Sequence, residues 1–126
     1  MFAVIYQAYI YPKREIEYQE AWHKVADYFV KSRGSIGSCL HRGEGGLWIA
    51  YSRWPDKATR DASWPGHNTP SSEMPEDIKK AITTIQECIV HDRKIPEICV
   101  DVIDDLLLNN AVKEGAGSIK KLRAHL

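Results

Sequence analysis

The chain has 126 residues, a length that one compact domain fills. Hydrophobic residues make up 44% and charged residues 27% of the sequence, which excludes collagen-like, low-complexity and wholly disordered proteins. Seventeen basic and seventeen acidic residues give a formal net charge of zero, so no overall field attracts nucleic acid. We therefore expect one globular domain with no nucleic-acid partner, and a neutral surface that permits association between copies.

The cysteines and the hydropathy pattern bear on the compartment. Cys39, Cys88 and Cys99 are widely spaced and form no Cys-x-x-Cys pair, which predicts reduced and mostly buried thiols. No stretch approaches the ~20 apolar residues of a membrane span, and the N-terminus carries no basic leader. These features predict a cytoplasmic protein with no membrane partner.

The first half of the chain alternates strand and helix signals. Residues 2–11 are β-branched and aromatic and stop at Pro12, which predicts a strand buried on both faces, with Gln7 as its only amide. From Lys13 to about Ser32 apolar residues recur at steps of three and four, which predicts a helix. Residues 36–42 and 47–54 are two β-like runs joined by Gly-Glu-Gly-Gly, and we expect them to form an antiparallel hairpin.

The second half begins with a short helix over 57–63, because Pro55 and Asp56 suit a first helical turn. Residues 67–74 are rich in Asn, Thr, Pro and Ser and predict a surface loop that could act as a lid. A long helix follows from Pro75 to residues 93–94, and a fourth strand covers 95–106. Residues 109–126 contain Gly-Ala-Gly-Ser and predict a flexible tail, so we assign the domain to residues 1–108.

This order of elements predicts an α+β fold, the β-α-β-β-α-β ferredoxin-like sandwich. Four strands and two covering helices leave one face of the sheet without helices. That face must be either polar or covered. Because its strands carry both apolar and polar side chains, we expect a second chain to cover it. We therefore predict a homodimer that associates through the sheet faces, in the manner of a dimeric α+β barrel.

The hairpin strand LWIAYSRW at 47–54, followed by the helix start PDKA at 55–58, resembles the antibiotic biosynthesis monooxygenase domain, a dimeric α+β barrel family. The resemblance extends through the opening strand and the Pro12-Lys13 pair and covers roughly residues 1–106. It implies that the sheets of two protomers pack together and that a pocket lies between each sheet and its helices. Members include cofactor-independent oxygenases of phenolic or quinol-like aromatics, haem-degrading enzymes, and proteins without a known reaction.

The chain departs from the family pattern at two places, and both bear on which activity the resemblance implies. Members often carry a His nine residues after the Trp matched by Trp54, and Ser63 stands there in this chain. The haem-degrading branch places an Asn on the first strand and a Trp after the short helix, positions that Gln7 and Trp64 fit approximately. Its haem-ligating His follows that Trp by several more residues than His67 follows Trp64, so haem degradation is the less favoured alternative.

The candidate site begins with Trp64, His67 and Asn68, which follow the short helix where a lid over the pocket would start. An indole can stack on an aromatic ligand and donate one hydrogen bond, and an imidazole can move a proton near neutral pH. The alternative is that Trp64 anchors the loop and His67 is solvated.

Three further candidates lie on predicted strands. Gln7 could hold a substrate oxygen or an O2-derived oxyanion, or it could bond to a neighbouring strand or span the dimer interface. Tyr51 and Arg53 could share the pocket, although a strand Tyr is more often a packing residue and Arg53 could pair with an acid.

Two carboxylate–histidine pairs have the one-turn spacing of a metal site, Glu20 with His23 and Glu87 with His91. Neither pair has a second copy to complete a ligand set, so we expect contacts on a helix surface. Asp101, Asp104 and Asp105 at the last strand could bind a cation, but the favoured interpretation is a solvated strand end. The sequence contains no phosphate-binding glycine loop, no G-x-S-x-G elbow and no Rossmann fingerprint. We expect neither a metal nor another cofactor.

The leading hypothesis is a cofactor-independent monooxygenase that acts on a small activated aromatic, whose ionised ring supplies the electrons to O2. In this hypothesis His67 and Gln7 are catalytic, and the substrate-binding residues are Trp64, Asn68, Tyr51 and Arg53. The alternative is a non-catalytic ligand-binding or assembly module on the same fold.

Overall fold

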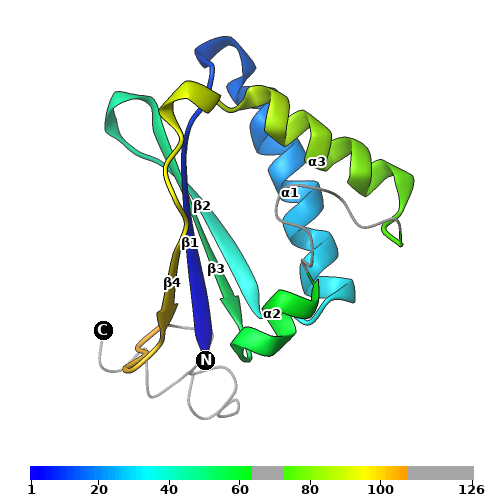
Figure 1. Ribbon diagram of the computed structural model, residues 1–126, viewed down its shortest axis with the longest axis vertical. Helices are drawn as coiled ribbons and strands as arrows, with labels where there is room; N and C mark the ends of the chain where they lie inside the picture. The colour runs from blue at the N-terminus through cyan, green and yellow to red at the C-terminus, as the bar shows by residue number, and fades with distance from the viewer. Residues whose placement is uncertain (64–72, 108–126) are drawn as a thin grey trace, which may run out of the picture.

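The computed structural model describes residues 1–63 and 73–107. They form four strands, β1 (Phe2–Tyr9), β2 (Gly37–Arg42), β3 (Leu47–Trp54) and β4 (Ile98–Asp101). Their helices are α1 (Glu15–Ser32), α2 (Lys57–Ser63) and α3 (Glu76–Cys88), with short 3-10 turns at Pro12–Arg14, Glu44–Gly46 and His91–Arg93. Figure 1 shows α1 and α3 side by side on one side of the sheet, with α2 near its lower end.

The sheet has the strand order β2-β3-β1-β4, and every neighbouring pair is antiparallel. Phe2 of β1 lies opposite Trp54 of β3 and Asp101 of β4, which fixes the register of the three strands. This arrangement confirms the predicted α+β ferredoxin-like fold. It also makes β1 and β3 the central strands and leaves β2 and β4 as edges.

Three predicted boundaries differ from the structure. β1 ends at Tyr9, and Ile10 forms only an isolated bridge with Ile89. α3 ends at Cys88, because Ile89 adopts an extended conformation and takes part in that bridge instead of a further helical turn. β4 is limited to four residues and begins two residues after Pro96, which has no N–H to give to a strand ladder.

The two faces of the sheet have different surroundings. Phe2 and Val4 of β1 form a cluster with Trp54, against which Phe29 of α1 packs. Successive strand residues point to opposite sides, so the even-numbered residues of β1 and β3 lie on the helix-facing face. The odd-numbered residues of both strands therefore lie on the opposite, helix-free face.

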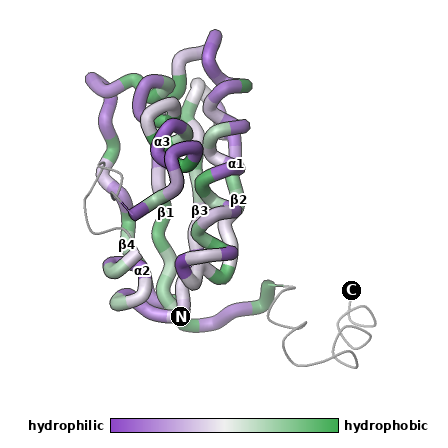
Figure 2. Tube along the Cα trace, turned by 90° about the vertical axis from the view of Figure 1, so that its right-hand side faces the viewer, coloured by the Kyte–Doolittle hydropathy of each residue, from purple (hydrophilic) through white to green (hydrophobic). Residues whose placement is uncertain are grey.

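The main apolar cluster joins α1 to α3 and consists of Ala21, Val25, Met74, Ile78, Ala81 and Ile82. A second cluster anchors the other end of these helices to the sheet through Ile10, Tyr18, Trp48 and Cys88. Figure 2 shows α3 and α1 in front of the sheet, with α1 on the β2 side and with α2 and β4 together on the other side. In the described part of the chain, no helix is long and apolar enough to cross a membrane.

The cysteines correct one prediction. All three thiols are free, but Cys39 and Cys99 are exposed and only Cys88 is buried. Cys39 and Cys99 lie on β2 and β4, the two edge strands, where neighbouring strands cover one side only. The composition of the chain does not indicate which cysteines lie on edge strands.

Candidate functional site

The strand candidates Gln7, Tyr51 and Arg53 lie together on the helix-free face. Gln7 lies opposite Ile49 in an unbroken register, and Tyr51 and Arg53 follow at steps of two along β3. The structure therefore corrects the expected position of Gln7, which does not face the helices. Trp48 and Trp54, which do, occupy the alternate positions.

Arg53 forms an ion pair with Asp105, and the two side chains are only 5% and 13% exposed. The guanidinium carbon also lies 6.0 Å from the centre of the Tyr51 ring. The acidic partner that the sequence left open for Arg53 is thus Asp105. The solvated strand end predicted for these acidic residues is wrong for Asp105, because its side chain is paired with the buried Arg53 and is only 13% exposed.

Trp64, His67 and Asn68 lie outside the described residues. Ser63, the last residue of α2, is buried, and its Oγ lies 2.7 Å from the carbonyl oxygen of Thr59 and 2.9 Å from that of Arg33. The single hydroxyl proton of Ser63 is directed at these two carbonyl oxygens, one from each helix end. Ser63 therefore ties the end of α2 to the end of α1.

The helix-facing face carries a polar cluster that sequence reasoning missed, formed by Tyr6, Arg60 and Glu97. Tyr6 is in the middle of β1 opposite Ala50, and its side chain is 38% exposed. None of the three apolar clusters includes Tyr6. This aromatic ring in the centre of the sheet is thus partly exposed and lies outside the packed apolar clusters.

Arg60 reaches this ring from α2. The helix begins after Asp56, whose carboxylate accepts a hydrogen bond of 2.7 Å from the backbone N–H of Thr59. One turn further on, Nη2 of Arg60 lies 3.4 Å from the Tyr6 hydroxyl and 2.6 and 2.8 Å from the two carboxylate oxygens of Glu97. The Arg60 side chain is only 12% exposed, whereas its partner Glu97 is 38% exposed.

The electrostatics keep both groups of this pair protonated. Burial raises the pKa of Tyr6, and the hydrogen bond from Arg60 offsets only part of that effect. Burial lowers the pKa of Arg60, but its hydrogen bonds to Tyr6 and Glu97 outweigh burial and raise the pKa overall. At neutral pH the cluster therefore presents a phenol beside a guanidinium, a pair of hydrogen-bond donors.

Two buried donors on this side of the sheet lack acceptors in the described part of the chain. They are Nε of Arg60 and the indole Nε1 of Trp54, a residue that is 3% exposed. Buried polar groups are almost always hydrogen-bonded, because leaving one unpaired costs about 1–3 kcal/mol. Such donors are suited to an acceptor oxygen supplied by a bound molecule.

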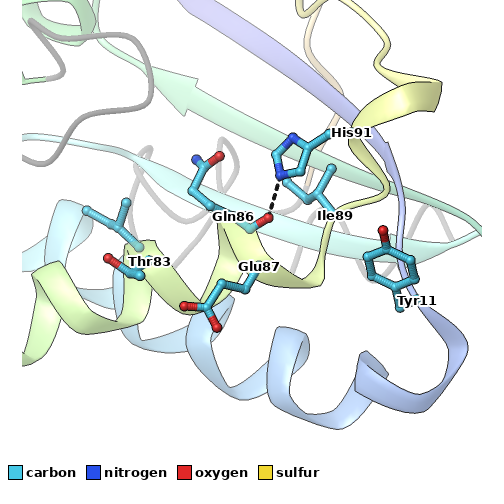
Figure 3. Close-up of a pocket in the computed structure, with 7 residues that line it drawn as sticks. Tyr11, Thr83, Gln86, Glu87, Ile89 and His91 are labelled. Atoms are coloured by element: carbon cyan, nitrogen blue, oxygen red, sulfur yellow. Dashed lines mark hydrogen bonds between the residues drawn. The ribbon is translucent and has the colours of Figure 1, made fainter.

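A surface pocket of about 400 Å³ lies beside the end of α3, lined by residues that include Tyr11, Gln86, Glu87 and His91 (Figure 3). His91 Nε2 contacts the Gln86 carbonyl oxygen at 2.7 Å, whereas Glu87 pairs with Arg14. Glu87 and His91 therefore contact different partners and not each other.

A wider groove between α1 and β2 contains the other pair, Glu20 and His23. Within residues 1–63 and 73–107, no group of three or more His, Cys, Asp or Glu side chains is placed to hold a metal ion.

Solved structures with the same fold are similar along most of this chain. One antibiotic biosynthesis monooxygenase structure has a TM-score of 0.60 and 16% identity, covering 82% of this chain and 100% of the other. SnoaB, a cofactor-independent oxygenase from Streptomyces nogalater, has a TM-score of 0.60 and 10% identity, covering 83% and 95%. The chain shares the ferredoxin-like α+β fold of these structures.

Other structures with this fold are described without an activity. A conserved protein from Methanosarcina mazei Go1 has a TM-score of 0.60 and 13% identity over 79% of this chain and 89% of its own. No protein-family model and no curated protein sequence matches the chain. The antibiotic biosynthesis monooxygenase fold is thus shared by oxygenases and by proteins without an assigned reaction.

Proposed function

We propose that this protein is a cofactor-independent monooxygenase of a small activated aromatic, phenolic or quinol-like, bound on the helix-facing side of the sheet. The observation that carries the proposal is a set of donors on that side: Nε of Arg60 and Nε1 of Trp54, which are buried without acceptors in the described part of the chain, and the Tyr6 hydroxyl beside Arg60. An ionised phenol offers the oxygen that these donors lack. The shared fold with SnoaB supports the reaction class.

The chemistry needs only substrate and O2. A base removes a phenolic proton, and the resulting anion carries negative charge on a ring carbon. That carbon transfers electrons to O2 and forms a hydroperoxide, which loses water and leaves one oxygen atom on the ring. The protein contributes binding, proton removal and stabilisation of the anion.

Residues that follow α2 supply the remaining roles in this proposal. We assign proton transfer to His67 and ring contacts to Trp64 and Asn68, because they come directly after Ser63, which is tied to α1. Gln7, Tyr51 and Arg53 are assigned to the helix-free face, where a substrate between sheet and helices would not meet them.

We also propose that a second copy of the chain covers the helix-free face. Ile5, Ile49 and Tyr51 are half-buried there, and Ile98 on the adjacent edge strand is 45% exposed. Two antiparallel sheets can pack face to face with their side chains interdigitated. Gln7 near the middle of this face can donate and accept, so an amide from each copy could pair across the interface.

Oxygen consumption with naphthohydroquinone as the probe tests the reaction. The expected product is 2-hydroxynaphthoquinone, formed together with water from one O2 per probe molecule. Formation of plain naphthoquinone and hydrogen peroxide at the rate seen without protein would contradict the oxygenase proposal. Saturable binding without turnover would support a ligand-binding module instead.

A further inference from the structure

We propose that Tyr6 and Arg60 form an oxyanion site that takes the ionised oxygen of an aromatic ligand, with Glu97 as the residue that positions Arg60. The inference rests on the proposed function, because it names the group of that substrate which the protein recognises. It also assigns anion stabilisation to side chains on the helix-facing face, a role that Gln7 cannot fill from the other side of the sheet.

The hydrogen bonds of Arg60 involve Nη1 and Nη2 and leave Nε without an acceptor among the described residues. Nη2 is occupied by both oxygens of Glu97 and also contacts Tyr6, and Nη1 lies 3.4 Å from Asp61. Nε is buried and has no acceptor within the described ranges. Because Nε and Nη2 share one edge of the guanidinium, the free N–H lies beside the contact with Glu97 and not at the opposite end of the group.

The Tyr6 hydroxyl provides the second donor. Its oxygen accepts from Arg60, so its own proton is directed elsewhere, and no described side chain lies within hydrogen-bond distance to accept it. A hydroxyl that accepts from a cation becomes a stronger donor, because such hydrogen bonds polarise one another. The exposed ring of Tyr6 adds an apolar surface next to these donors, which suits an aromatic ligand.

Glu97 fixes the position of the Arg60 guanidinium but does not occupy its Nε donor. It lies just before β4, at the edge of the sheet opposite Tyr6, and its side chain is 38% exposed. Both of its oxygens contact Nη2, which fixes the end of a long side chain that would otherwise sample many rotamers. Glu97 does not reach Nε, so the place of the anion stays open.

The probe for this site is para-nitrophenol, whose phenolate is yellow and whose phenol is nearly colourless. The probe is titrated with wild-type protein in a buffer slightly more acidic than its own pKa, until absorbance saturates. Two donors that favour the anion should raise the phenolate-to-phenol ratio of the bound probe about tenfold, which is a shift of about one pKa unit.

The variants separate the donors from their surroundings. Tyr6→Phe keeps the ring but removes the hydroxyl, and Arg60→Gln removes the charge, so each should abolish most of the shift. Tyr9→Phe on the helix-free face and Lys57→Gln, whose exposed ammonium pairs with Asp61, are matched controls that should keep it. Glu97→Gln retains an acceptor for Nη2 and should keep the shift, whereas Glu97→Ala should reduce it.

The site is overturned if the probe does not bind saturably, if the bound probe shows no shift, or if Tyr6→Phe leaves the shift unchanged. Circular dichroism confirms that each variant is folded before it is scored. Failure of the oxygenase proposal has a different signature, because the ionisation shift would be present while naphthohydroquinone gives no hydroxylated product.

Discussion

The Arg53 guanidinium and the Asp105 carboxylate form a nearly buried ion pair on the helix-free face. The pair connects β3 with the segment that follows β4, and its two residues are 52 positions apart in the chain. Asp105 also accepts a hydrogen bond of 3.0 Å from the backbone N–H of Leu107, which holds this segment in a turn. The end of the described chain is thus tied to Arg53, near the end of the central strand β3.

Replacing Asp105 by Ala should lower the free energy of unfolding by about 3 kcal/mol, because it leaves the buried Arg53 charge without this carboxylate. Urea denaturation followed by circular dichroism measures the change. Asp104→Ala is the matched control, since Asp104 is exposed, and its effect should stay within about 0.5 kcal/mol. Equal midpoints for the two variants would refute a stabilising role of the ion pair.

Asp56 should make part of the stability depend on pH. The hydrogen bond from the Thr59 N–H is the largest cause that lowers the pKa of Asp56 below its ordinary value of 3.8. A carboxyl with a lowered pKa stabilises the fold when ionised, and this contribution is lost as the pH falls through the folded-state pKa. Asp56→Asn keeps a capping side chain that does not titrate.

The denaturation midpoint of wild type should therefore fall more steeply below about pH 4 than that of Asp56→Asn. Other carboxyls with lowered pKa values, such as Glu17 and Asp61, contribute equally to both proteins. Parallel curves for the two proteins would show that the cap does not respond to pH.

The proposed dimer predicts a mass of about twice 14.4 kDa by sedimentation at micromolar concentration. Ile49→Lys places a charge in the middle of the helix-free face and should shift the equilibrium to monomer. Ile16→Lys is the control, because Ile16 is 74% exposed on α1, away from that face. A wild-type protein that is well folded and monomeric would contradict the proposed dimeric barrel.

Local signals made much of the fold predictable. The strand at 47–54 and the short helix at 57–63 match their predicted bounds, because a glycine-rich turn and a Pro-Asp start lie within a few residues of them. β4 and the end of α3 were less predictable. Their ends depend on pairing between Ile10 and Ile89 and between Ile5 and Ile98, partners that lie far apart in the sequence.

The site was less predictable for a related reason. Alternation along β1 showed that Gln7 and Tyr6 lie on opposite faces, but both faces are apolar, so the pattern did not show which face the helices cover. In such a strand the sequence indicates that Tyr6 is a packing residue. Arg60 and Glu97 are 37 positions apart, and no spacing rule connects them before the sheet is assembled.

The residues after α2 give a prediction of their own. Trp64→Ala should weaken binding of naphthohydroquinone about tenfold through loss of ring contact. His67→Ala should lower turnover about a hundredfold with a smaller effect on binding, as expected for a group that acts in the transition state. His23→Ala on the exposed side of α1 serves as the control. Equal losses in binding and turnover for His67→Ala would contradict its catalytic role.

Labelling with oxygen-18 gas tests the central claim most directly, because the new ring oxygen can come only from O2 or from water. Wild-type protein should convert naphthohydroquinone to 2-hydroxynaphthoquinone with one labelled oxygen per molecule by mass spectrometry, and Tyr6→Phe should form this product much more slowly. Unlabelled product, or labelled product at the same rate with and without protein, would contradict monooxygenation by this chain.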